Sequence, residues 1–146
     1  MSALPCPAAD PFAAAEQEFD TITTFLCSQE AGSLTHSDLE RMLEAKGREL
    51  LRKLLQAHLD LRHPGEAAGP VRDAAGETQS RARLHDRQLE CIFGTVTVSR
   101  TGYGAEGKAS LHPLDGALNL PVEKYSHEVR RRVWPSRRRR TRSTKA

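Results

Sequence analysis

The sequence has little of what builds large cores, disulfide frameworks or membrane spans. Aromatic residues make up 5% and hydrophobic residues 38% of the 146 positions, so we expect a small ordered core. The three cysteines lie far apart, without a CxxC pair or a histidine at zinc-finger spacing, which is typical of free thiols. No apolar run approaches the roughly 20 residues that span a bilayer, and the N-terminus does not resemble a secretory signal. We therefore expect a cytoplasmic protein with no membrane partner.

Acidic residues are also missing after Glu128, and this absence divides the charge of the chain. Residues 130–146 hold nine Arg or Lys, whereas residues 1–129 carry thirteen basic and nineteen acidic side chains, a net charge of −6. The overall formal charge of +3 hides this contrast. The break indicates either an arm that binds nucleic-acid phosphates or a stretch whose origin differs from the rest of the chain.

Helical periodicity begins after residues 1–10, a Pro- and Ala-rich lead-in that we expect to be disordered. From Pro11, apolar residues recur at alternating spacings of three and four, which predicts one apolar face of a helix. These residues are Phe12, Ala15, Phe19, Ile22 and Leu26. We expect this helix to end near Gln29.

A longer second helix is predicted over residues 36–62, with Thr35 as its N-cap and Pro64 just beyond its end. Leucines line one face of it, namely Leu39, Leu43, Leu50, Leu54 and Leu61. The two helices are expected to form a helical hairpin over residues 11–63. The leucine stripe also makes a homodimer through residues 36–62 a candidate interaction.

The periodicity changes to that of strands after residues 64–80, a Gly- and Ala-rich stretch that is typical of a linker. Alternation of Thr and Val predicts a β-hairpin over residues 82–103, with a tight turn at Phe93-Gly94 and with Val96 and Val98 buried. We place three basic side chains on the opposite, polar face, where they either contact phosphates or are simply solvated; these are Arg83, Arg87 and Arg100. Such a hairpin needs a cover for its apolar face.

Three glycines that follow the second strand give a loose match to a dinucleotide-binding fingerprint, namely Gly102, Gly104 and Gly107. They do not open a helix, so the match fails in its context and the glycines are better interpreted as a turn. We therefore predict no cofactor and no small-molecule substrate.

Three segments of the sequence are more informative about its family than any single charged residue. They are residues 47–62 (GRELLRKLLQAHLDLR), residues 89–103 (LECIFGTVTVSRTGY) and residues 111–127 (LHPLDGALNLPVEKYSH). Together they resemble the N-terminal region of the ISKra group of bacterial insertion-sequence transposases, over about residues 12–133. The matching motif residues are Phe93, Gly94, Arg100, Tyr103, His112, Pro113, Leu114, Asp115, Asn119, Pro121, Ser126 and His127.

The resemblance implies a protein that cuts and joins DNA in a separate RNase H-like domain, with three carboxylates and divalent metal. In the family that domain follows the last motif, whereas here nineteen residues follow His127 and none beyond Glu128 is acidic. We therefore expect no catalytic or metal-binding residue and no enzyme activity. Asp73 and Asp86 are not expected to bind metal, and Asp115 is expected to form a turn by bonding to nearby backbone.

The expected fold class is α+β, with the helical hairpin, a β-hairpin, loop and short C-terminal helix over residues 81–133, and disordered ends. The resemblance stops at Val133, where the family continues with small residues. Arginine codons read in a shifted frame encode small residues, so we expect that a single-nucleotide slip, by mutation or programmed frameshifting, produced residues 134–146.

Three functions remain open from the sequence. The first is a truncated, non-catalytic transposase region that binds DNA without strand-transfer chemistry. The second is a stand-alone nucleic-acid-binding protein that uses the Arg-rich tail, and the third is a helical dimerisation module. For the first two, the candidate phosphate contacts are Arg130, Arg131, Arg132, Arg137, Arg138, Arg139, Arg140, Arg142 and Lys145.

Overall fold

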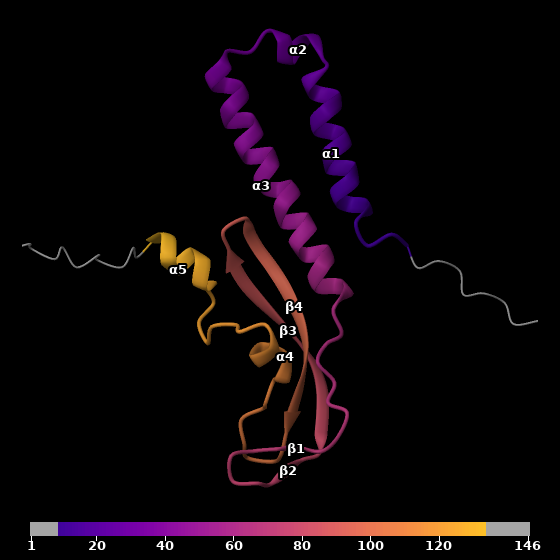
Figure 1. Cartoon of the computed structure of the whole chain (residues 1–146), viewed down its shortest axis with the longest axis vertical. Helices are drawn as coiled ribbons and strands as arrows, with labels where there is room; N and C mark the ends of the chain where they lie inside the picture. The colour runs from indigo at the N-terminus through magenta and orange to yellow at the C-terminus, as the bar shows by residue number, and fades with distance from the viewer. Residues whose placement is uncertain (1–8, 134–146) are drawn as a thin grey trace, which may run out of the picture.

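The computed structural model describes residues 9–133, which form helices and antiparallel hairpins (Figure 1). The predicted α+β class is confirmed. Our predictions for residues 1–8 and 134–146, including the basic tail, lie outside the described residues. The elements are α1 (Ala13–Leu26), α2 (Gln29–Gly32), α3 (His36–Leu61), β1 (Val71–Arg72), β2 (Thr78–Gln79), β3 (Arg81–Cys91), β4 (Gly94–Gly104), α4 (Pro113–Ala117) and α5 (His127–Val133).

The helical hairpin consists of α1 and α3, which run side by side and are connected through the short α2 (Figure 1). The predicted first helix was too long, because α1 ends at Leu26 and a separate turn follows. The hydroxyl of Ser28 accepts a hydrogen bond from the Ala31 amide (3.2 Å) and so starts α2 as a new element. The predicted N-cap of α3 is correct, since Thr35 accepts from the Asp38 amide.

One face of α1 packs on α3, with Ala15 and Ile22 buried. Across this interface the Glu18 carboxylate lies 2.6 Å from the ammonium of Lys53 and 3.9 Å from that of Lys46. Apolar burial brings the helices together, and this ion-pair network fixes which residues of α3 face Glu18.

The central element, below the helices in Figure 1, is a two-stranded ribbon of β3 and β4. Its register pairs Leu89 with Val96, and Val96 and Val98 are the largest fully buried side chains of the described residues, as predicted. The predicted turn was displaced by one residue, because Cys91 pairs with Gly94 and leaves Ile92 and Phe93 as the two-residue loop.

Both edges of the ribbon are partly covered by other parts of the chain. On the β4 edge, the Gln56 carboxamide of α3 bonds to both the amide (2.8 Å) and the carbonyl (2.9 Å) of Thr97. Further along, Tyr103 exchanges two 2.7 Å backbone hydrogen bonds with Leu111. On the β3 edge, Glu90 forms a parallel bridge with Tyr125. These contacts satisfy backbone groups that an isolated hairpin would leave to solvent.

The stretch predicted as a linker contains a small hairpin of its own, β1 paired with β2. The carboxylate of Asp73 organises its turn by accepting 2.9 Å hydrogen bonds from the amides of Ala75 and Glu77. Among residues 9–133, no helix is long and apolar enough to cross a membrane, and no cluster of side chains suits a metal ion.

Candidate nucleic-acid interface

A basic groove lies along one face of the ribbon, at the end away from the turn. In the β3–β4 register, Arg81 lies opposite Gly104 and Arg83 lies opposite Gly102. Because alternate residues of a strand share a face, Arg81, Arg83 and His85 all project on the same side. The facing glycines carry no side chain, so they leave space beside the cations. The resulting groove has a volume of about 180 Å³ and is also lined by Ala105, Lys108 and Ser110.

The groove carries positive charge that the surrounding protein only partly neutralises. Arg81 and Arg83 are exposed and make no ion pair or side-chain hydrogen bond with any residue in the described range. Lys108, in contrast, pairs with Glu77 and with Asp73 (2.9 Å), and these two carboxylates raise the pKa of its ammonium. Two guanidinium groups are therefore available to an anion, with a third cation at the rim.

His85 lines this groove, and the ring of His112 packs against it. His85 and His112 meet edge to face, with ring centroids 5.7 Å apart. Burial is the main cause that lowers the pKa of His112, and the positive charges of Arg100 and Arg87 lower it further. A β-carbon at Gly102 would lie 2.8 Å from the His85 ring and 2.9 Å from the His112 ring, so the close approach requires glycine. The pKa of His112 thus lies below its ordinary value, in the direction that favours the uncharged ring.

Arg87 and Arg100 do not lie where we predicted. The register places Arg87 opposite Val98, and Arg100 follows Val98 by two residues, so both lie on the face of the buried valines. Their guanidinium groups converge on Asp115, with Arg87 Nη1 3.6 Å from its carboxylate and Arg100 in direct contact with it. Neither arginine is part of a solvated face or positioned on an open surface for phosphates.

Asp115 also departs from its predicted role as a turn former bonded to nearby backbone. Its side chain binds the two arginines of the ribbon, while α4 itself is closed by backbone hydrogen bonds. Arg87 in addition donates to the carbonyls of Pro121, Val122 (3.2 Å) and Glu123 (2.6 Å). The result is a clamp, formed by Arg87, Arg100 and Asp115, that holds residues 113–123 against the ribbon.

The remaining motif residues also have structural positions. Pro113 is the first residue of α4, Leu114 is buried, and Asn119 adopts a left-handed conformation (φ 49°) just after the helix. The Tyr103 hydroxyl accepts a 2.7 Å hydrogen bond from the Ala67 amide. Ser126 accepts from the Val129 amide (3.3 Å), and exposed His127 begins α5.

At the ribbon turn, Phe93 is half-buried beside Leu43 and Leu51 of α3, and Gly94 begins β4. The motif residues therefore have structural roles, because they hold the segments on either side of the ribbon in place.

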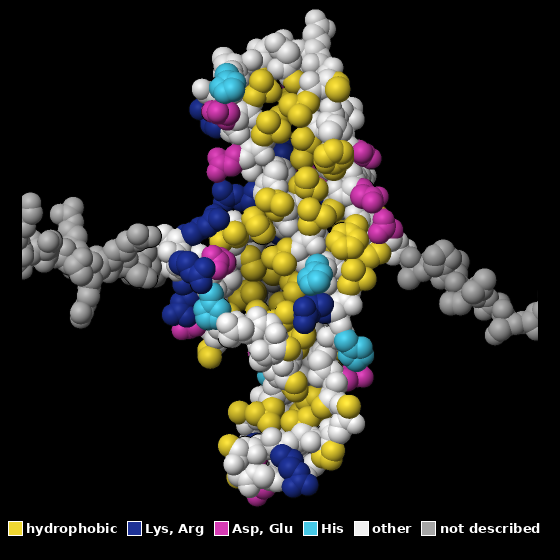
Figure 2. Space-filling model, viewed as in Figure 1, with side chains coloured by type: hydrophobic (Ala, Val, Ile, Leu, Met, Phe, Trp, Pro, Cys, Tyr) yellow, Lys and Arg dark blue, Asp and Glu magenta, His cyan; other side chains and the backbone are white. Residues whose placement is uncertain are grey.

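The predicted phosphate contacts of the C-terminal helix have different surroundings. Arg130 pairs with Glu123 (3.0 Å) and Arg131 pairs with Glu128 (2.7 Å). Arg132 lines a shallow groove with Leu43 and Leu51 of α3. The other predicted contacts, Arg137 through Lys145, lie outside residues 9–133. Figure 2 shows Lys and Arg side chains gathered on the side of the molecule where α5 lies.

No family model, curated protein or solved structure matches this chain. Sequence reasoning missed Arg81 and Lys108 as site residues. It placed Arg83 on the face opposite Val96 and Val98, which is wrong, because Arg83 lies four residues before Arg87, the partner of Val98, and so shares the face of the valines. The signal for the groove was present in β3, where Arg81, Arg83, His85 and Arg87 alternate with other side chains.

Proposed function

We propose that this chain is a non-catalytic DNA-binding region of an insertion-sequence transposase of the ISKra type. The transposase assignment is supported by the sequence resemblance. The DNA-binding assignment is supported by the basic groove, whose exposed Arg81 and Arg83 face a strand that is open at two glycines. The proposal rests on these two arginines, which are unpaired within residues 9–133 and each lie opposite a glycine that leaves room for a ligand. Guanidinium groups bind phosphate oxygens in a bidentate manner.

In this proposal the ribbon contacts the sugar–phosphate backbone, and the groove contributes affinity without base readout. Each phosphate contact releases counterions, so the logarithm of the binding constant falls by about 0.9 per contact for each tenfold rise in salt on B-DNA. The arginines of α5 add charge near the turn of the ribbon. We assign no strand-transfer chemistry to the chain.

The test is a salt titration of duplex DNA binding by the full chain, followed by fluorescence anisotropy. We expect the double substitution Arg81→Gln and Arg83→Gln to reduce the salt slope by about 2, because two phosphate contacts are lost. The matched control is Arg41→Gln with Arg48→Gln, which removes the same charge from α3, where both arginines pair with carboxylates. If the control reduces the slope equally, the effect is one of net charge and the groove is not the interface.

A further inference from the structure

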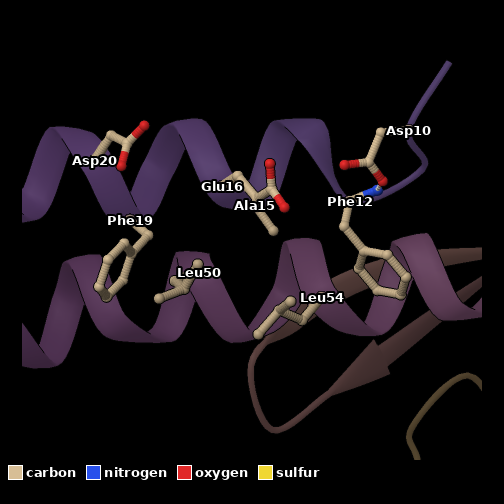
Figure 3. A pocket seen from close by; sticks show the side chains of 8 residues that line it. All are labelled: Asp10, Phe12, Ala15, Glu16, Phe19, Asp20, Leu50 and Leu54. Atoms are coloured by element: carbon tan, nitrogen blue, oxygen red, sulfur yellow. Dashed lines mark hydrogen bonds between the residues drawn. The ribbon is translucent and has the colours of Figure 1, made fainter.

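An apolar groove runs between α1 and α3. It lies on the helical hairpin, whereas the basic groove lies on the ribbon of β3 and β4. Figure 3 shows the rings of Phe12 and Phe19 directed from the α1 side toward α3, where Leu50 and Leu54 lie between them. Ala15 provides the small residue at the floor, and the groove has a volume of about 530 Å³. Figure 2 shows hydrophobic side chains gathered along this face of the helical hairpin.

The groove exists because α3 covers only part of the apolar stripe of α1. Ala15 and Ile22 are buried, but Phe19, which lies between them in the same stripe, keeps 55% of its surface exposed. On the opposite wall Leu54 keeps 38% exposed. Large apolar side chains that remain exposed together, in a concave surface, are typical of a protein-binding groove.

The rim of the groove is acidic. Asp10, Glu16 and Asp20 line it, and α1 contains no Lys or Arg at all. Glu16 and Asp20 make no ion pair with any residue between 9 and 133, whereas Glu18 of the same helix is already held by Lys53. Figure 3 shows the carboxylates of Glu16 and Asp20 on the α1 wall of the groove. An occupant would therefore meet apolar side chains at the centre and uncompensated negative charge along one edge.

We propose that this groove binds a basic amphipathic helix of a partner protein. Phe12, the N-cap of α1, and Phe19 are seven residues apart, a spacing that corresponds to about 10 Å or two turns of a helix. A partner helix with apolar residues at positions i, i+3 or i+4, and i+7 matches this length, and Lys or Arg beside them meets the acidic rim. A second copy packed face to face would place its acidic rim near this one, so charge disfavours it.

The test uses the full chain and two synthetic fluorescein-labelled helices with the same Leu positions, one with Lys and one with Glu on the polar face. We expect the Lys peptide to bind at least tenfold more tightly than the Glu peptide, by fluorescence anisotropy. A Lys peptide of identical composition with scrambled Leu positions should bind as weakly as the Glu peptide, because it cannot present an apolar face. Equal binding of the scrambled peptide would overturn the proposal.

Variants of the groove separate specific binding from general charge attraction. Phe19→Ser should weaken the Lys peptide at least tenfold, whereas Val122→Ser, at a side chain 98% exposed outside the groove, should not. Glu16→Lys with Asp20→Lys should reverse the preference toward the Glu peptide, and both positions are exposed, so the fold should be retained. A Phe19-dependent dimer in light scattering, without peptide binding, would show that a second copy occupies the groove and would refute the proposal.

Discussion

The clamp of Arg87, Arg100 and Asp115 allows a test of how the motif segment is held. Asp115→Ala removes the single carboxylate between two guanidinium groups whose side chains are 13% and 16% exposed. The arginines would then remain largely buried, close to each other and without a counter-charge. The substitution should therefore destabilise the fold through the electrostatics of the groups that it leaves behind.

The magnitude follows from the geometry of the clamp. At 3.6 Å, and with an effective dielectric constant of about 20, the attraction between Arg87 and Asp115 alone is about 4–5 kcal/mol. Partial hydration of the arginines, and the hydrogen bonds that Arg87 donates to the carbonyls of residues 121–123, recover some of this loss. We expect a net loss of about 2–4 kcal/mol, a large part of the roughly 5–15 kcal/mol typical of a domain.

Urea unfolding followed by far-ultraviolet circular dichroism measures this loss. With a typical slope of about 1–3 kcal/mol per molar urea, the midpoint should fall by about 0.7–4 M. Asp115→Asn, which keeps the shape but removes the charge, should lose most of the same stability. The matched control is Glu44→Gln, which breaks an i,i+4 pair with Arg48 on exposed α3 and should cost less than about 0.5 kcal/mol.

A second substitution should partly restore the stability that Asp115→Ala removes. In the Asp115→Ala background, Arg100→Met removes one of the two guanidinium charges that have lost their counter-charge. It should therefore restore part of the lost stability. Midpoints for both Asp115 variants that match the control would refute the assignment of the clamp as a structural element. Additive effects of the two substitutions would show that Arg100 and Asp115 are not coupled.

Two further predictions concern the segments that the clamp joins. Gly65→Ala should lower the free energy of unfolding by about 2–4 kcal/mol in thermal unfolding, because φ is +81° and the new carbon would lie 2.9 Å from Leu114 Cβ. The control is Gly76→Ala, where φ is +82° but the surrounding space is open. It should cost only the backbone strain, about 1–2 kcal/mol. For His112, burial and Arg100 lower the folded-state pKa below the ordinary 6.5, so the unfolded chain binds the proton first. Stability should be full above about pH 6.5 and fall at lower pH, and His112→Gln should flatten this dependence in urea midpoints; an unchanged slope would contradict it.

Local periodicity predicted the elements and the buried valines well. Thr35 as a cap and the alternation around Val96 and Val98 depend only on neighbouring residues, and both predictions are confirmed. The same alternation could have placed Arg100 with the valines. The face of Arg83 and Arg87 additionally required the register, which the two-residue loop at Ile92 and Phe93 determines.

Long-range contacts account for what the sequence did not reveal. The partner of Arg100 is a carboxylate on α4, and no local pattern announces that pairing. The apolar stripe of α1 was correctly found, but its burial depends on how closely α3 approaches, and Phe19 is left largely exposed. The separation of Ser28 and α2 from α1 likewise depends on a cap that competes with helix continuation.

The bond pair between Gln56 and Thr97 has a consequence for how the molecule unfolds. A single side-chain amide takes the place of a neighbouring strand, so β4 is completed by a helix. Fraying of α3 at this turn would expose an amide and a carbonyl of the ribbon, and separation of the ribbon would leave the carboxamide oxygen of Gln56 without its donor, while its nitrogen would keep only Asp60 (2.9 Å). The helical hairpin and the ribbon are thus thermodynamically linked, and a force applied to one is transmitted to the other through Gln56.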